Sequence, residues 1–258
     1  MMLKIYLKKI LTSRIFWLVI VINIITLIIG GWYDIVQGVE ESALHLFRYS
    51  SNFGIGIIVS LILYAFPFLY IFCGEISGNV TKYQLIRYGS KGYFIIQSLA
   101  AVISVILLSL VTLTLFSIAA AACFQKTIEI TSSEMESYSQ NWYWNYGVDT
   151  TLRLYILSGV SYVLLLMPCV MFAIVSSLYI KNKYLIYAMP YVFFRLTQII
   201  SGLMGNLDID LSNTYIGAIY VKSGHHMLYC ILYPVVLTVV FAVYYIFIRK
   251  RRLLNGHV

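Results

Sequence analysis

The sequence predicts an all-α membrane protein with six transmembrane helices and both termini in the cytoplasm. Hydrophobic residues make up 61% of the 258 residues and charged residues only 11%, whereas soluble chains carry about 25% charged residues. The mean hydropathy is +0.86. So much apolar surface exceeds what one soluble core can bury, so we expect lipid to cover much of it. Residues 1–258 are expected to form a single transmembrane domain.

Six stretches are long enough to cross a bilayer, which takes roughly 20 apolar residues at a rise of about 1.5 Å each. In order they are Ile15–Tyr33, Phe53–Cys73, Tyr93–Phe124, Leu154–Ile180, Tyr184–Leu203 and Met227–Ile248. The third exceeds the thickness of a bilayer, so we expect it to tilt or to project beyond the headgroups.

The charges between these stretches are sorted by side. Lys and Arg concentrate in the N-terminal segment, the second-to-third connection, the fourth-to-fifth connection and the C-terminal tail, while nearly all the acids lie in the other connections. Because positively charged loops stay in the cytoplasm, both termini are expected there. The formal net charge of +8 follows from this topology, so we expect a lipid bilayer and no nucleic acid as partner. The location is expected to be the plasma membrane of a bacterial cell.

Residues 1–14 predict an amphipathic helix that lies along the inner leaflet. Four apolar residues share one of its faces: Leu3, Leu7, Ile10 and Leu11. Lysines lie away from that face, where anionic headgroups attract them. We therefore expect this segment to anchor the chain at the cytoplasmic surface.

The longest connection, residues 125–153, is expected to be extracellular. It is first acidic and then aromatic, with Trp142, Tyr143, Trp144 and Tyr146 close together. Trp and Tyr favour the headgroup zone, so these side chains form either an interfacial collar or an outer lip that contacts an amphipathic or cationic substrate.

The sequence contains no motif for catalysis. The phosphate loop G-x-x-x-x-G-K-[ST] is absent, as are H-E-x-x-H and paired-cysteine metal motifs. The predicted spans contain no carboxylate, which argues against an intramembrane enzyme and against a proton-coupled carrier. We therefore expect neither an enzyme nor a metal site in this chain.

One charge lies inside a predicted span. Tyr187, Tyr191, Arg195 and Gln198 recur at helical spacing in the fifth stretch and share one face. A membrane-buried Arg costs about 2.5 kcal/mol or more unless it finds partners or water. Two interpretations stay open: Arg195 pairs with freed carbonyls or with an outer acid such as Asp208 or Asp210, or it lines the path of an anionic or peptide substrate.

The cytoplasmic connection at residues 74–92 reads GEISGNVTKYQLIRYGSKG. Glycines bound a short segment, Asn79–Tyr88, which is expected to form a helix. A basic loop that merely obeys the positive-inside rule is the simpler interpretation. The acid at Glu75 and the compact helical segment are more than that rule requires.

At these residues the chain resembles a permease subunit of the type-2 ATP-binding-cassette (ABC) transporters. Those permeases have six helices, cytoplasmic termini and an amphipathic N-terminal helix. Their first inner loop carries a coupling helix, with an acid after the second span, then a glycine, then a basic residue followed by a small one. The residues that match or lie within this loop are Glu75, Gly78, Lys82, Arg87, Gly89 and Lys91.

The resemblance implies an assembly and a function. A second permease chain, identical or different, is expected, and two cytosolic ABC ATPase subunits would bind ATP and Mg²⁺ and dock on the coupling loops. Small permeases of this kind without a fused ATPase often export peptides or give immunity to antimicrobial peptides. Short helices dipping back from the outer face are expected between Met204 and Met227. The rival hypothesis is a membrane immunity or sensor scaffold that binds a peptide outside and transports nothing.

Overall fold

The computed structural model describes residues 2–37, 42–52, 55–77, 89–124, 126–130, 151–205, 210–212 and 226–254. These residues form helices and no β-strand; an isolated bridge joins Ser42 to Thr127. The predicted all-α class is therefore confirmed. In chain order the helices are α1 (Met2–Leu11), α2 (Arg14–Gly30), α3 (Trp32–Val36), α4 (Ala43–Asn52), α5 (Ile55–Ser77), α7 (Ser90–Phe124), α9 (Thr151–Ser176), α10 (Lys183–Met204) and α12 (His226–Leu254).

Four described helices are long and apolar enough to cross a membrane. Their apolar segments are Gly56–Glu75, Gly92–Phe124, Thr151–Ser176 and Ile231–Arg249. Helices α1 and α2 meet at 55° and count as a fifth candidate if the bent pair is one span. The described residues thus contain four or five helices that could span a membrane, whereas six spans are not shown. The predicted span that does not qualify is the one at α10, where Arg195 and Gln198 interrupt the apolar run.

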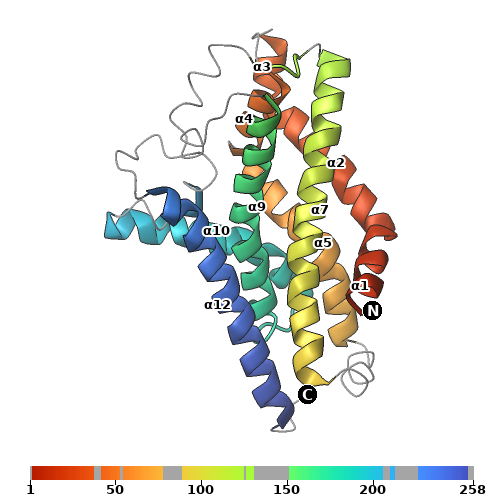
Figure 1. The fold of residues 1–258 in the computed structure, drawn as a ribbon, viewed down its shortest axis with the longest axis vertical. Coiled ribbons are helices and arrows are strands. Elements are labelled where there is room, and N and C mark those ends of the chain that lie inside the picture. The colour runs from red at the N-terminus through yellow and green to blue at the C-terminus, as the bar shows by residue number, and fades with distance from the viewer. Residues whose placement is uncertain are drawn as a thin grey trace.

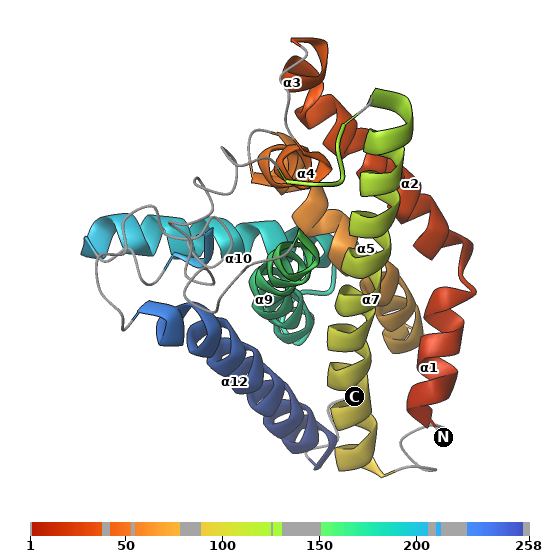
Figure 2. The ribbon, with the colours of Figure 1, turned by 45° about the horizontal axis from the view of Figure 1, so that its top comes forward.

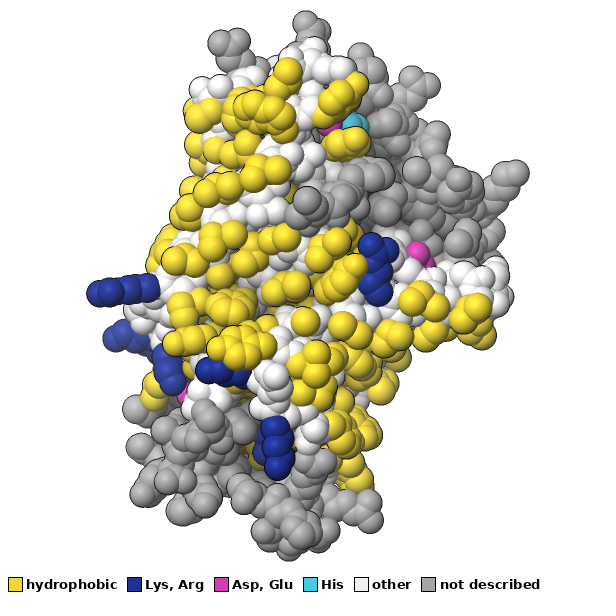
Figure 3. Space-filling model, turned by 180° about the vertical axis from the view of Figure 1, so that it is seen from behind, with side chains coloured by type: hydrophobic (Ala, Val, Ile, Leu, Met, Phe, Trp, Pro, Cys, Tyr) yellow, Lys and Arg dark blue, Asp and Glu magenta, His cyan; other side chains and the backbone are white. Residues whose placement is uncertain are grey.

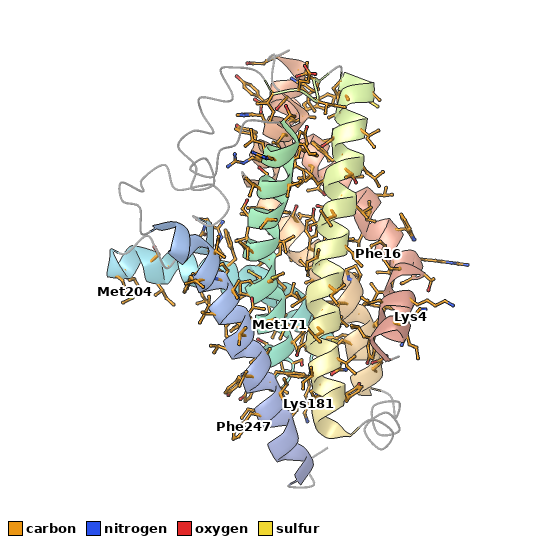
Figure 4. All side chains as sticks on the ribbon, viewed as in Figure 1. Lys4, Phe16, Met171, Lys181, Met204 and Phe247 are labelled. Carbon is orange, nitrogen blue, oxygen red and sulfur yellow. The ribbon has the colours of Figure 1, made fainter. Side chains whose placement is uncertain are left out.

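The long helices alternate in direction (Figure 1). Helices α2 and α7 ascend in that view, and α5, α9 and α12 descend. Since α9 and α12 descend in succession, the chain between them must return upward, and α10 makes part of that return. The C-terminal end of α10, which carries Met204, projects sideways from the bundle (Figures 2 and 4). This helix therefore lies largely across the bundle, unlike its neighbours.

Helix α9 is the centre of the bundle. It packs against α5, α7, α10 and α12, and 83% of its apolar segment is buried, compared with 17% for α12. Three rings join α9, α10 and α12: Phe172 stacks on Phe193 with centroids 4.6 Å apart, and both meet Phe241 edge-on. Helix α12 is thus held along one side and leaves most of its apolar surface uncovered by the described chain.

Helix α4 lies in a connection that the sequence placed outside the membrane. Its residues Ala43, Leu44 and Phe47 are almost completely buried. The Phe47 ring meets Phe116 of α7 and Tyr162 of α9 edge-on, with centroids 5.7 and 5.6 Å apart. This first outer connection therefore contributes a helix to the core.

Helix α1 confirms a helical N-terminal segment but ends earlier than predicted. The chain turns at Thr12, and the Ser13 side chain accepts a hydrogen bond from the Ile15 amide as the N-cap of α2. Such caps satisfy one of the unpaired amides at the start of a helix. The buried face also differs from the predicted one, because Tyr6 and Ile10 are buried while Leu11 is exposed.

The surface agrees with a lipid-facing protein. Hydrophobic side chains cover much of the described surface in Figure 3, and most of the Lys and Arg side chains visible there lie toward its lower part. Large exposed apolar residues recur along α2, α10 and α12, for example Ile29, Leu203 and Phe247. Soluble monomers rarely expose contiguous apolar surface on this scale, so these faces are compatible with a multi-pass membrane protein.

Candidate functional site

Glu75 is buried near the C-terminal end of α5, with only 4% of its surface exposed. Its carboxylate accepts hydrogen bonds from the Tyr6 hydroxyl and from Lys9 Nζ, the latter at 2.8 Å. A buried carboxylate is stable as an anion only with a counter-charge and donors around it. Helix α1 supplies both, because Tyr6 and Lys9 stand three positions apart and share one side of that helix.

The hydrogen bonds continue from Tyr6 into two further helices. The Tyr6 and Tyr93 hydroxyls are 3.3 Å apart. Gln97 Nε2 donates to the Tyr93 hydroxyl at 2.7 Å, and the Tyr245 hydroxyl donates to Gln97 Oε1 at 2.8 Å. We call these residues the Glu75 network: Tyr6, Lys9, Glu75, Tyr93, Gln97 and Tyr245.

The Glu75 network ties α1, α5, α7 and α12 together at one end of the bundle. Tyr93 and Gln97 are four residues apart, so they point from the same face of α7. The network therefore joins one ion pair, between Lys9 and Glu75, to the neutral hydroxyl and amide groups of its other members.

The remaining predicted coupling residues are only partly within the described structure. Gly78, Lys82 and Arg87 lie outside the described residues. Gly89 has a φ of 72° immediately before α7, a left-handed conformation that glycine adopts without a steric penalty. Lys91 lies in the first turn of α7. The structure thus brings Glu75 to the end of one helix and Gly89 to the beginning of the next.

The predicted polar face of α10 is divided. Tyr187 is buried and packs against Phe66 of α5, with ring centroids 4.8 Å apart. Arg195 is exposed; its Nε donates to the Tyr191 hydroxyl at 2.9 Å and its Nη1 to Gln198 Oε1 at 2.8 Å. Tyr191, Arg195 and Gln198 therefore form one group, while Tyr187 belongs to the core.

Several other predicted site residues lie outside the part of the chain that the structure describes. The outer aromatic residues Trp142, Tyr143, Trp144 and Tyr146 lie outside the described residues, as does Asp208. Asp210 accepts a hydrogen bond from the Ser212 amide at 2.8 Å, and the side-chain hydrogen bonds of Arg195 go to Tyr191 and Gln198 instead. Within the described ranges, no three His, Cys, Asp or Glu residues cluster as a metal site would require.

Sequence reasoning identified Glu75 but missed the five other members of its network. Tyr6 lies on the apolar side of an amphipathic helix, where a lone tyrosine signals a buried hydroxyl in need of a partner. Gln97 is an amide inside a long apolar run, which is an equally useful signal. The sequence gives no such signal for Tyr93 and Tyr245, because tyrosine is common throughout this chain.

The far end of the network allows a matched test. Tyr245→Phe removes the hydroxyl that donates to Gln97 and leaves a buried amide oxygen without that donor, so we expect about 1 kcal/mol less stability. Tyr244→Phe removes an exposed hydroxyl that pairs with the exposed Tyr179 hydroxyl, and it should have little effect because water can replace that partner. Thermal unfolding of both purified variants in one detergent measures the difference, and equal losses would contradict the network.

Comparison of the chain with protein-family models, with curated proteins and with solved structures gives no match. The function is therefore argued from the residues and their geometry.

Proposed function

We propose that the chain is the membrane-spanning permease subunit of an ATP-driven ABC transporter. The observation that carries this proposal is the Glu75 network. It lies where α5 ends and α7 begins, on both sides of the segment predicted to couple to an ATPase. A permease needs a rigid link at this place, because force applied to the inner loop has to reach the spans.

The geometry of the network suits such a link. Glu75 stands just before the predicted coupling segment, and Tyr93 and Gln97 stand just after it. Any displacement of that segment moves both ends of the network, and the hydrogen bonds carry the movement to α1 and α12. Buried side-chain networks transmit displacement well since their members exchange partners only in discrete steps.

The proposal includes the full topology of six spans with both termini in the cytoplasm. The bent pair of α1 and α2, together with α5, α7, α9 and α12, accounts for five crossings, and α10 with the chain beyond it supplies the sixth. The direction of the helices supports this topology: α1 and the C-terminal end of α12 both lie in the lower half of Figure 1, as an even number of crossings requires.

Peptide export, or immunity to an antimicrobial peptide, is the proposed activity. A second permease chain completes the pathway, and ATP and Mg²⁺ bind to two separate cytosolic ATPase subunits. The aromatic outer connection at residues 125–153 would meet the peptide at the outer face. The setting in this proposal is a bacterial plasma membrane.

Purification from native membranes in mild detergent tests the proposal. Mass analysis of the complex should find a soluble ATPase in stoichiometric amount. A complex that contains a peptide and no ATPase would instead favour the scaffold hypothesis, in which the chain binds a peptide outside and transports nothing.

Reversing one charge in the predicted coupling segment tests the contact itself. We expect Arg87→Glu to release the ATPase and to abolish transport-coupled stimulation of its activity, because an acidic docking groove would repel the new carboxylate. Lys181→Glu makes the same reversal at an exposed residue of the other predicted inner connection and should retain the ATPase. Unchanged stimulation in the Arg87 variant would remove the coupling role, provided that its thermal unfolding matches that of the unaltered chain.

A further inference from the structure

Arg195 is held in a fixed orientation on the exposed side of α10. Two hydrogen bonds run along the helix, to Tyr191 one turn before it and to Gln198 one turn after it. The guanidinium also lies 5.5 Å from the centroid of the Tyr191 ring. Two of its five N–H donors are used in this way, so three remain for a ligand.

The charge of Arg195 is not neutralised by these contacts. Tyr191 and Gln198 are both neutral, and guanidinium groups stay protonated in proteins. Neither α10 nor α12 contains an Asp or Glu, and Asp210, which follows α10, accepts a hydrogen bond from the Ser212 amide. Among the residues that the structure describes, no carboxylate forms an ion pair with Arg195, so its three open donors can receive an anionic ligand.

The surroundings of Arg195 are apolar. Exposed aliphatic side chains flank it on α10 and continue toward the projecting end: Val192, Leu196, Ile199 and Leu203. A free inorganic anion would gain nothing from this surface, whereas a molecule with an anionic head and apolar chains would contact both parts. The site therefore suits an anionic amphiphile.

We propose that Tyr191, Arg195 and Gln198 bind the phosphate of an anionic phospholipid whose acyl chains lie along the aliphatic side of α10. A guanidinium binds phosphate through two parallel hydrogen bonds, which are stronger than neutral ones. The Tyr191 hydroxyl, one turn before Arg195, and the Gln198 amide nitrogen, one turn after it, complete the set of hydrogen-bond donors. The assignment does not depend on whether an ATPase drives the protein.

Two other occupants fit the site less well. A cationic peptide would be repelled by Arg195. A second copy of the chain, packed symmetrically through α10, would bring the two Arg195 side chains toward each other without an acid between them, because symmetric interfaces juxtapose the same patch. The charge of the site thus selects an anionic lipid over both.

Native mass spectrometry of the full chain tests this proposal. The chain is titrated in detergent with phosphatidylglycerol, with zwitterionic phosphatidylcholine, and with glycerol 3-phosphate as a soluble headgroup. We expect saturable binding of phosphatidylglycerol, weaker by about tenfold in Arg195→Gln, and little binding of the other two probes. Arg195→Lys should lie between, since lysine keeps the charge and loses the planar fork.

Lys181→Gln is the matched control, because it removes one positive charge from an exposed residue at the start of the connection to α10. It should change phosphatidylglycerol binding by less than about twofold. Equal binding of phosphatidylcholine, equal binding by Arg195→Gln, or displacement of the lipid by glycerol 3-phosphate would each overturn the proposal. A dimer that is lost in Arg195→Gln while lipid binding persists would assign this face to a second copy instead.

Discussion

Glu75→Ala is expected to lower the free energy of unfolding by roughly 2–3 kcal/mol, which is one of the two largest effects we predict. The charge-assisted hydrogen bond from Tyr6 accounts for most of this loss, since such bonds contribute about 1.5–3 kcal/mol. The ion pair with Lys9 adds less, because the Lys9 side chain is 52% exposed and water screens it. Thermal unfolding in detergent should show a midpoint roughly 5–10 °C lower for a chain of this size.

Two variants separate the parts of this effect. Glu75→Gln keeps an oxygen for Tyr6 and loses the charge, so its stability should lie between those of Glu75→Ala and the unaltered chain. Lys9→Gln removes the half-exposed partner and should cost less than Glu75→Ala. If Lys9→Gln were the most harmful of the three, the carboxylate would depend on its counter-charge rather than on Tyr6, and our account of the network would be wrong.

Gly56→Ala is expected to be about as damaging, by about 1–3 kcal/mol, through sterics rather than charge. A Cβ atom at this position would lie 1.9 Å from the backbone oxygen of Ser50. Backbone cannot rotate away as a side chain can, so α4 would have to shift out of the core. Protease protection of the α4 region and the unfolding midpoint should both decrease.

The matched control is Gly159→Ala in α9. Its added methyl group would meet Leu113 Cδ2 at 3.5 Å, an ordinary contact, and alanine favours the helical conformation over glycine by about 1 kcal/mol. Gly159→Ala should therefore leave stability unchanged or raise it. A similar loss in both variants would show that α4 is less tightly seated than its burial indicates.

Apolar length made the candidate spans predictable, and polar residues in α10 leave one of the six predicted spans unconfirmed. Each of the six predicted stretches coincides with a helix, because long apolar runs have few other ways to satisfy their backbone in lipid. Helix α10 has the length of a span but carries Arg195 and Gln198, and it lies largely across the bundle. Length and mean composition do not encode a helix's direction, which depends on its contacts with α5 and α9.

The sequence did not reveal α4 or the Glu75 network for a related reason. The ten-residue α4 segment mixes Leu44, Leu46 and Phe47 with Arg48 and other polar residues, so it is too short and too polar to be predicted as a span. It is buried because Phe47 fits between rings of two other helices. Similarly, Gln97 and Tyr245 are 148 positions apart, and only the packing of α7 beside α12 brings them together.

The central position of α9 has a consequence for biogenesis. A ribosome delivers α2, α5 and α7 to the membrane first, and the faces that α5 and α7 later bury against α9 remain uncovered until residue 176 has been synthesised. The nascent bundle is therefore a partly folded intermediate that lacks its central helix. Contacts among α1, α2, α4, α5 and α7 hold it together at this stage. Helix α12 arrives last and attaches along a single side. The order of synthesis thus separates an early N-terminal half, whose inner faces are still uncovered, from α12, which completes the Glu75 network only after Tyr245 has been synthesised.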